Sequence, residues 1–205
     1  MKKTTVRAVG FIGVLVLAGA TCQSQEFIPD PDETINDYIS LGEFNEAGNA
    51  EGWKGSGSTD LSVENGVLKV KTIGGGPWYS IRGIQDAPVG FYLVEMRFRI
   101  LERGAGEWDL YWGDEAAPSF EAERRYRHAP WPDDEEFTIV QYDLDGILNG
   151  ALTHLRFDPT GVAGTVLEVD YVRFGTISDD SDEDGLPDTV ETDTGEFIDA
   201  RDTGT

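Results

Sequence analysis

Apolar and polar residues alternate through the middle of the chain, and this pattern predicts strands. In FYLVEMRFRIL, residues 91–101, one face is apolar and the other charged: Val94, Met96, Phe98 and Ile100 against Glu95, Arg97 and Arg99. A period of two residues is typical of a strand with one buried face. In LSVENGVLKV, residues 61–70, a strand pattern on each side of the turn dipeptide Asn65-Gly66 predicts a hairpin.

Further strand-like segments follow, with Gly, Pro or Asp clusters between most of them. They are a short segment at 41–44, then WYSIRGI (78–84), WDLYWGD (108–114), FTIVQYDL (137–144), THLRFDP (153–159) and VLEVDYVRFG (166–175). No segment shows a helical period over three turns. About eight strands without helices predict an all-β fold. This number favours a jelly-roll β-sandwich over residues 40–176, and an immunoglobulin-type sandwich is the alternative.

The first twenty residues have the three parts of an export signal. Lys2, Lys3 and Arg7 give a positive start, Val9 to Leu17 is apolar, and Ala18-Gly19-Ala20 fits a small-residue cleavage site. The apolar stretch is shorter than the roughly 20 residues that a membrane-spanning helix needs. We therefore predict a signal peptide over residues 1–20, no transmembrane helix, and a secreted or cell-surface protein, extracellular or periplasmic.

The stretch after the signal reads as a tether. Residues 21–39 contain two prolines, several acids and no periodicity, which predicts a flexible linker. Cys22 is the only cysteine, so no internal disulfide can form within one chain. Its place just after the apolar stretch offers an alternative to simple secretion, in which Cys22 carries a lipid anchor at a new N-terminus. Thr21 and Gly19 match such lipoprotein signals poorly.

The chain is strongly acidic, with a formal net charge of −23. This charge argues against nucleic acid or an anionic membrane surface as a partner. The acidity is concentrated after residue 178, where eleven acidic residues stand against one arginine. An acidic, solvated tail is one interpretation of this segment.

A more specific interpretation comes from the spacing of those acids in DSDEDGLPDTVE, residues 180–191. Carboxylates occupy positions 1, 3, 5, 9 and 12 of a calcium loop, Gly185 permits the sharp bend at position 6, and the Leu186 carbonyl supplies position 7. The predicted Ca²⁺ ligands are Asp180, Asp182, Asp184, Leu186, Asp188 and Glu191. An EF-hand has a helix on each side, whereas VDYVRFGTIS before this loop reads as a strand and a turn.

This loop resembles the thrombospondin type 3 repeats and dockerin-like calcium loops of secreted bacterial proteins. The resemblance implies a calcium-binding repeat over residues 177–205. Such repeats normally occur in tandem, whereas one loop is present here.

The central region resembles the galactose-binding-like jelly rolls. The resemblance rests on EFNEAGNAEGWKGSG (43–57), LSVENGVLKV (61–70) and LRFDPTGVAGTVLEVDYVRFG (155–175). It implies a jelly roll related to the carbohydrate-binding modules of secreted polysaccharide-degrading enzymes, with a glycan as partner. In that fold the first and last strands often hold a structural calcium, and Glu43 and Asp170 are the residues that would contribute.

Aromatic residues are the candidate sugar platform, because sugar rings stack on Trp and Tyr. We name four candidates: Trp78, Tyr79, Tyr126 and Trp131. The alternative is that these rings fill the core, and since Trp78 and Tyr79 are adjacent on a strand, one should point outward. Tyr126 and Trp131 lie in RRYRHAPWP, predicted as a loop, whose arginines could meet a carboxylated or sulfated sugar or pair with the nearby acids DDEE.

Catalytic motifs are absent from the sequence. There is no G-x-S-x-G, and His128 and His154 have no zinc-ligand spacing. The run Gly74 to Pro77 lacks the features of a phosphate loop. We therefore expect a non-catalytic, calcium-binding, carbohydrate-binding protein. The alternatives are a structural or adhesive protein that uses the sandwich as a spacer, or a polysaccharide-degrading enzyme with a carboxylate pair. The sequence leaves the oligomeric state open.

Overall fold

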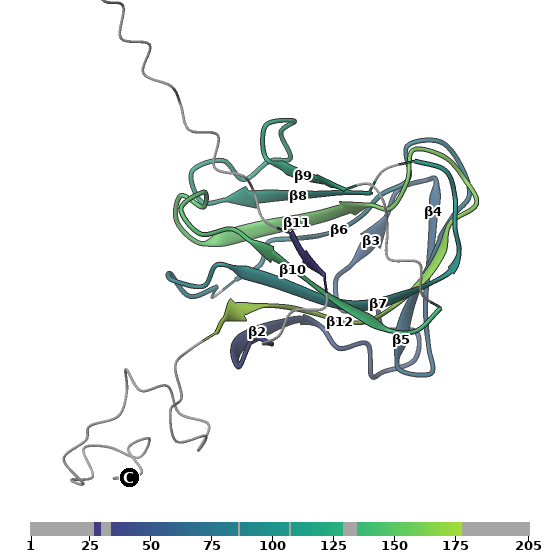
Figure 1. The fold of residues 1–205 in the computed structure, drawn as a ribbon, viewed down its shortest axis with the longest axis horizontal. Coiled ribbons are helices and arrows are strands. Elements are labelled where there is room, and N and C mark those ends of the chain that lie inside the picture. The colour runs from purple at the N-terminus through teal and green to yellow at the C-terminus, as the bar shows by residue number, and fades with distance from the viewer. Residues whose placement is uncertain (1–26, 30–33, 86, 107, 129–134, 178–205) are drawn as a thin grey trace, which may run out of the picture.

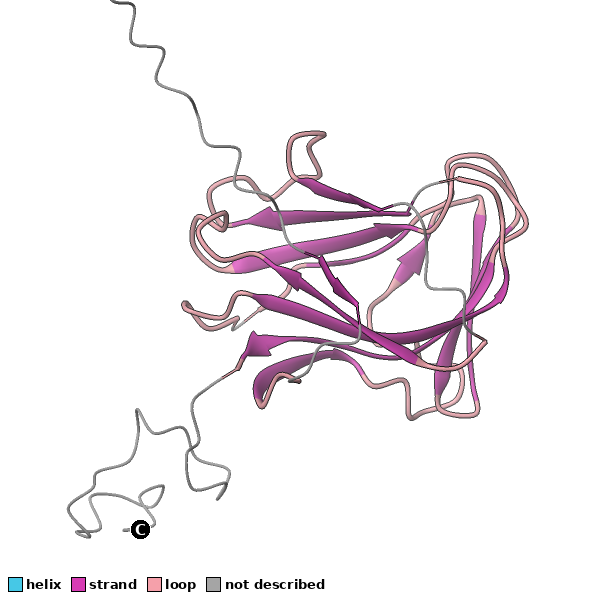
Figure 2. Ribbon diagram, viewed as in Figure 1, coloured by secondary structure: helices cyan, strands magenta, loops and turns pink. Residues whose placement is uncertain are grey.

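A computed structural model describes residues 27–29, 34–85, 87–106, 108–128 and 135–177. Within these residues all regular structure is β-strand, and no helix is present (Figure 2). The strands are β1 Phe27–Pro29, β2 Asp37–Gly42, β3 Lys54–Gly55, β4 Thr59–Glu64, β5 Val67–Thr72, β6 Tyr79–Arg82, β7 Leu93–Glu102, β8 Trp108–Asp114, β9 Arg125–His128, β10 Thr138–Asp143, β11 Leu152–Asp158 and β12 Val166–Thr176.

The strands form two antiparallel sheets that face each other as the layers of a sandwich (Figure 1). The larger sheet has the order β1-β10-β7-β12-β5-β4, and β2 pairs with β12 as well. The smaller sheet has the order β3-β6-β11-β8-β9. Neighbours in both sheets are mostly distant in sequence, as in Greek-key arrangements. The predicted all-β, jelly-roll β-sandwich is confirmed.

The alternating pattern correctly places the core. On β7 the apolar face predicted from the sequence is buried, and β8 directs Trp108, Leu110 and Trp112 inward. At the centre the Tyr79 and Phe157 rings stack with centroids 5.3 Å apart, and Trp53 lies against both. These rings supply much of the apolar area removed from water.

The predicted hairpin is also present. β4 and β5 pair from Thr59↔Thr72 to Glu64↔Val67, and the two residues between them have positive φ, 56° at Asn65 and 78° at Gly66. A two-residue turn of this hand matches the twist of the strands that it joins, and Asn-Gly favours it.

Two parts of the predicted organisation are wrong in detail. β1 and the first residues of β2 lie within residues 21–39, which the sequence analysis assigns to a linker. β1 pairs with β10, and Ile35 is buried, so part of this segment belongs to the sandwich. The stretch RRYRHAPWP is not all loop, because Arg125–His128 forms β9 at the edge of the smaller sheet. Both segments are too short or too polar to show an alternation of their own.

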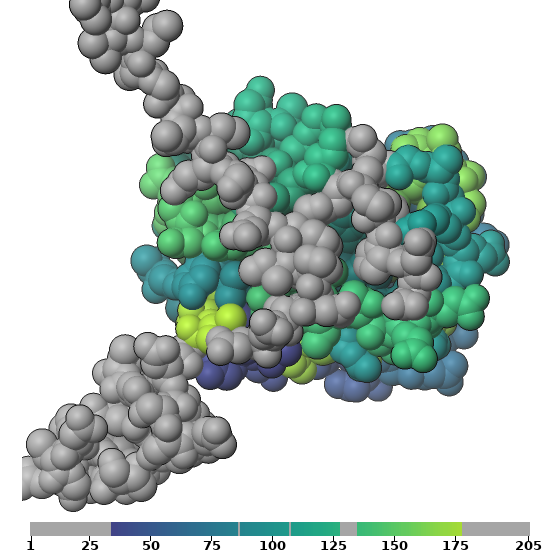
Figure 3. All heavy atoms as spheres, viewed as in Figure 1, coloured from purple at the N-terminus to yellow at the C-terminus, as the bar shows by residue number. Residues whose placement is uncertain are grey.

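The start of β2 lies beside the end of β12, through the pairing Thr176↔Asp37. In Figure 3 the purple and yellow ends of the coloured chain accordingly lie next to each other. The predicted signal peptide, Cys22, Trp131 and the calcium loop lie outside the described residues. In the part of the chain that is described, no helix has the length and apolarity to cross a membrane.

Candidate functional site

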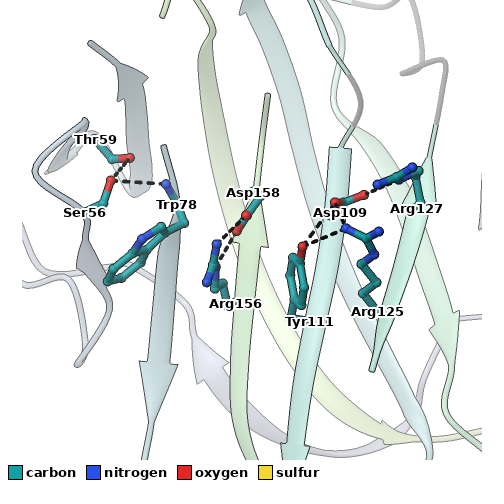
Figure 4. A network of polar contacts seen from close by, with 9 residues as sticks. All are labelled: Ser56, Thr59, Trp78, Asp109, Tyr111, Arg125, Arg127, Arg156 and Asp158. Carbon is teal, nitrogen blue, oxygen red and sulfur yellow. Dashed lines mark hydrogen bonds and ion pairs between the residues drawn. The ribbon is translucent and has the colours of Figure 1, made fainter. Parts of the chain in front are cut away.

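The outer face of the smaller sheet carries a patterned set of polar and aromatic side chains (Figure 4). Residues directly opposed in neighbouring strands share a face, so the strand register arranges these side chains in rows. The first row crosses all five strands as Lys54, Ser80, Arg156, Tyr111 and Arg125. The second row runs through Asp158, Asp109 and Arg127.

Arg156 is the centre of the first row. Its guanidinium lies 5.4 Å from the centroid of the Trp78 ring and 4.9 Å from that of Tyr111. Asp158, two residues further along β11, holds it through two hydrogen bonds of 2.6 Å each, from Nε and Nη2. A guanidinium between two rings and paired with a carboxylate is held in one orientation by both cation–π attraction and charge-assisted hydrogen bonds.

Asp109 contacts three side chains at the edge of the same face. Arg125 donates to Asp109 Oδ2 at 3.2 Å and to the Tyr111 hydroxyl oxygen at 3.0 Å. The Tyr111 hydroxyl lies 3.4 Å from the same carboxylate oxygen, and Arg127 Nε is 3.5 Å from Asp109 Oδ1. The Tyr111 ring is therefore fixed from both sides, by Arg156 and by the Arg125–Asp109 pair.

The backbone holds Trp78 in place just before β6. Its N–H lies 3.3 Å from Ser56 Oγ, and the Ser56 N–H donates to the Trp78 carbonyl at 2.8 Å. The hydroxyls of Ser56 and Thr59 are 3.1 Å apart. This bracket, also visible in Figure 4, orients the half-buried indole next to Arg156.

Opposing effects act on the pKa of the Asp158 carboxyl. Burial raises its pKa above the ordinary value for aspartate, and the charge of Asp109 on the neighbouring strand acts in the same direction, while Arg156 and Arg125 lower it. Burial outweighs the two guanidiniums. Arg156 is therefore the main group that favours the charged form of Asp158 on this face.

Only one of the four predicted stacking residues is placed on this face. Trp78 faces outward next to Arg156, as expected for one of two adjacent strand residues. Tyr79 and Tyr126 lie in the core instead, 0% and 2% exposed. Burial raises the pKa of both phenols. A buried ring cannot stack on a sugar, so these two assignments are corrected. Trp131 lies outside the described residues.

The candidates for a second calcium site are engaged by arginines. Glu43 accepts two hydrogen bonds from Arg173, at 2.8 and 3.1 Å, and Asp170 pairs with Arg97. Each carboxylate thus has a cationic partner within the protein, which does not favour a metal at this position. Among the described residues there is no group of three or more His, Cys, Asp and Glu side chains that could hold a metal ion.

The arginine-rich stretch divides between two places. Arg125 and Arg127 lie on the face, whereas Arg124 pairs with the buried Asp114 at 2.6 Å. Sequence reasoning missed Tyr111, Arg156, Asp158 and Asp109 as members of one site. The signal was available in THLRFDP, because alternation opposite Leu155 and Phe157 puts Arg156 and Asp158 on the outer face.

Comparison with known proteins gives a fold and no family by sequence. No family model and no curated protein matches the chain. A solved family 29 carbohydrate-binding module complexed with cellulohexaose matches with a TM-score of 0.50 at 13% identity, covering 69% of this chain and 92% of that one. Another variant of a family 29 module matches with a TM-score of 0.51 at 14% identity, covering 71% and 97%. The sandwich therefore has the fold of these carbohydrate-binding modules.

Proposed function

We propose that this protein is a non-catalytic module that binds a polysaccharide on the outer face of the smaller sheet. The observation that carries the proposal is the row in which the Arg156 guanidinium lies between the Trp78 and Tyr111 rings. Sugars present apolar ring faces and hydroxyl edges together. Rings alternating with hydrogen-bonding side chains offer partners for both.

The arrangement is preformed, which supports a binding role. The two guanidiniums of Arg156 and Arg125 are already fixed by Asp158 and Asp109, at 2.6 and 3.2 Å. Side chains that are ordered before binding lose less conformational entropy when the ligand arrives. The first row of the outer face is therefore pre-organised for the weak contacts that a sugar makes.

The solved neighbours support the same function. One is complexed with cellulohexaose, and others are variants made to probe the mechanism of ligand recognition. These similarities favour the binding module over the alternatives of a spacer or a degradative enzyme.

The test compares an outer aromatic residue with a core one. A panel of neutral and acidic polysaccharides is screened by affinity electrophoresis, and the affinity for the best ligand is then measured by calorimetry. Burying an exposed aromatic ring contributes about 1.5–3 kcal/mol, so Trp78→Ala should weaken binding about tenfold or more and leave the melting temperature nearly unchanged. Trp53→Ala, in the core, should lower the melting temperature instead, since truncating a buried Trp costs about 3–5 kcal/mol.

Other outcomes identify the rivals. Reducing sugar released from any polymer would support the enzyme. A blank panel would leave the spacer role, and unfolding of Trp78→Ala would show that its indole is structural. Export and calcium binding remain predictions from residues 1–20 and 180–191, and we propose them as accompanying properties of a secreted, carbohydrate-binding protein.

A further inference from the structure

A second cluster lies on the same outer face, where the loop between β8 and β9 folds onto the sheet. In the register, Gly113 on β8 opposes His154 on β11, which opposes Arg82 on β6. A Cβ at Gly113 would come within 3.1 Å of the Ser119 nitrogen, so the loop backbone lies directly over this row. The contact brings the next residue, Phe120, onto the sheet.

Two guanidiniums and an imidazole lie around the Phe120 ring. The Arg82 guanidinium is 4.8 Å from its centroid and that of Arg156 is 5.9 Å away, while His154 meets the ring at 5.8 Å in an edge-to-face geometry. Asp158 neutralises Arg156 through both its oxygens. Arg82 is exposed and has no ion pair among the described residues. We call Arg82, Phe120, His154 and Arg156 the Arg82 corner.

Among the described residues no ion pair offsets the charge of Arg82 in this corner. Burial lowers the pKa of His154, and the charge of Arg82 lowers it further, so the imidazole is in a positive field. The acid that follows Phe120 in the loop, Glu121, accepts a hydrogen bond of 3.1 Å from Ser119. Both oxygens of Asp158 accept hydrogen bonds from Arg156. The Arg82 guanidinium, which has no ion pair among the described residues, can therefore donate to a ligand.

The charge of the whole face also favours an anionic ligand. On a chain with a formal net charge of −23, the outer positions of this sheet concentrate basic side chains. They are Lys54, Arg82, Arg125, Arg127 and Arg156, against the carboxylates of Asp109 and Asp158. A positively charged surface attracts an anionic ligand, whereas the rest of this acidic protein repels it.

We propose that the Arg82 corner binds a sugar carboxylate, which makes the ligand a polysaccharide containing uronic acid. This inference rests on the proposed function and names its ligand class. A planar guanidinium matches a planar carboxylate with two parallel hydrogen bonds. The Arg156–Asp158 pair already has this geometry on the same face. Arg82 repeats the donor without a carboxylate acceptor among the described residues, so a carboxylate on the glycan would complete the pair.

The experiment uses the full chain and two uronate polymers, each paired with its own carboxyl-reduced form. Calorimetry measures binding of homogalacturonan and alginate, of the same two polymers after chemical reduction of their carboxyl groups, of cello-oligosaccharides, and of dextran sulfate. The variants are Arg82→Gln and, as a control, Lys71→Gln, which removes the same charge from an exposed position on β5 of the other sheet. Both positions are exposed, and melting curves check that both variants stay folded.

We expect at least one uronate polymer to bind about tenfold or more tightly than its reduced form, with the difference removed by Arg82→Gln and kept by Lys71→Gln. A hydrogen-bonded charge pair of about 1.5 kcal/mol or more corresponds to this factor. Added salt should weaken the uronate and not the neutral polymer. Equal affinity for native and reduced polymers, or equal binding of dextran sulfate, would overturn the uronate inference while carbohydrate binding stands. Binding to none of the polymers would overturn the proposed function as well.

Discussion

The buried carboxylate of Glu95 allows a quantitative test of how the larger sheet is held together. Glu95 is on the charged face of β7 but is 0% exposed. Its Oε2 accepts hydrogen bonds from the Ile35 N–H at 3.1 Å and from Gln141 Nε2 at 2.8 Å. Its Oε1 accepts from the Tyr171 hydroxyl at 2.9 Å. One side chain therefore joins β7 to β10, to β12 and to the segment that precedes β2.

Tyr171→Phe removes one hydroxyl and leaves Glu95 Oε1 without that donor. A hydrogen bond to a charged group contributes about 1.5–3 kcal/mol, and a buried charged acceptor left unsatisfied costs at least as much. We therefore expect the free energy of unfolding to fall by about 1.5–3 kcal/mol. Glu95→Gln keeps the shape, because the amide oxygen can accept from Ile35 and Gln141 while the amide nitrogen donates to the Tyr171 oxygen. We expect it to cost less than Tyr171→Phe does, about 1 kcal/mol or below.

Urea unfolding of the wild type, both single variants and the double variant gives the coupling between the two side chains. The control is Tyr38→Phe, which removes the hydroxyl of a tyrosine that is 40% exposed, and should change stability by less than about 0.5 kcal/mol. The coupling between Glu95 and Tyr171 should be at least about 0.5 kcal/mol. A Tyr171→Phe variant as stable as Tyr38→Phe, or a Glu95→Gln variant less stable than Tyr171→Phe, would refute this reasoning.

Three more predictions concern other parts of the chain. Burial raises the pKa of Asp114, but two backbone N–H groups and Arg124 outweigh burial, so the pKa of Asp114 is lowered. The stability that this shift contributes is present above the pKa of the unfolded state and is lost as pH falls through the pKa of the folded state. Asp114→Asn should cost about 2–4 kcal/mol at neutral pH and less in acid, measured by urea unfolding across pH. Calcium should bind wild type at about 10⁻⁴ to 10⁻³ M in calorimetry, with Mg²⁺ competing poorly, and equal heats from Asp182→Ala/Asp184→Ala would contradict this. Mass spectrometry of exported protein should find cleavage after the apolar stretch, and an N-terminus at Met1 would contradict it.

The fold was predictable because its burial follows a period of two. Trp108 and Trp112 are separated by an even number of residues, and both are buried on the inner face of β8. Trp78 and Tyr79 are adjacent, and they lie on opposite faces of β6 and its entry. In each case the side of the sheet depends on local geometry, which sequence contains directly.

The candidate site was less predictable, because its contacts join residues far apart in sequence. Arg-Tyr-Arg reads equally well as a basic loop or as an edge strand, and pairing with β8 decides between them. That pairing turns Tyr126 inward, where its hydroxyl donates to the Asp143 carbonyl. Similarly, Arg156 and Tyr111 meet only because β11 lies beside β8. Counting aromatic residues could not separate those that fill the core from those that face solvent.

The pairing of arginines explains why we propose the smaller sheet, rather than the larger one, as the ligand face. On the larger sheet Arg97, Arg99 and Arg173 each have a separate carboxylate within the protein. Because those arginines are already paired within the protein, they contribute little to the binding of an external ligand.

On the smaller sheet Arg125 and Arg127 both approach Asp109, whereas Arg82 has no carboxylate partner among the described residues. The rings of Trp78, Tyr111 and Phe120 each lie against an arginine on the same surface. A ligand that offers apolar ring faces and carboxylates at once would satisfy both groups, and a neutral sugar would satisfy only the rings. The Arg82 guanidinium therefore distinguishes the two ligand classes, and the comparison of native with carboxyl-reduced polymers tests whether it binds a carboxylate.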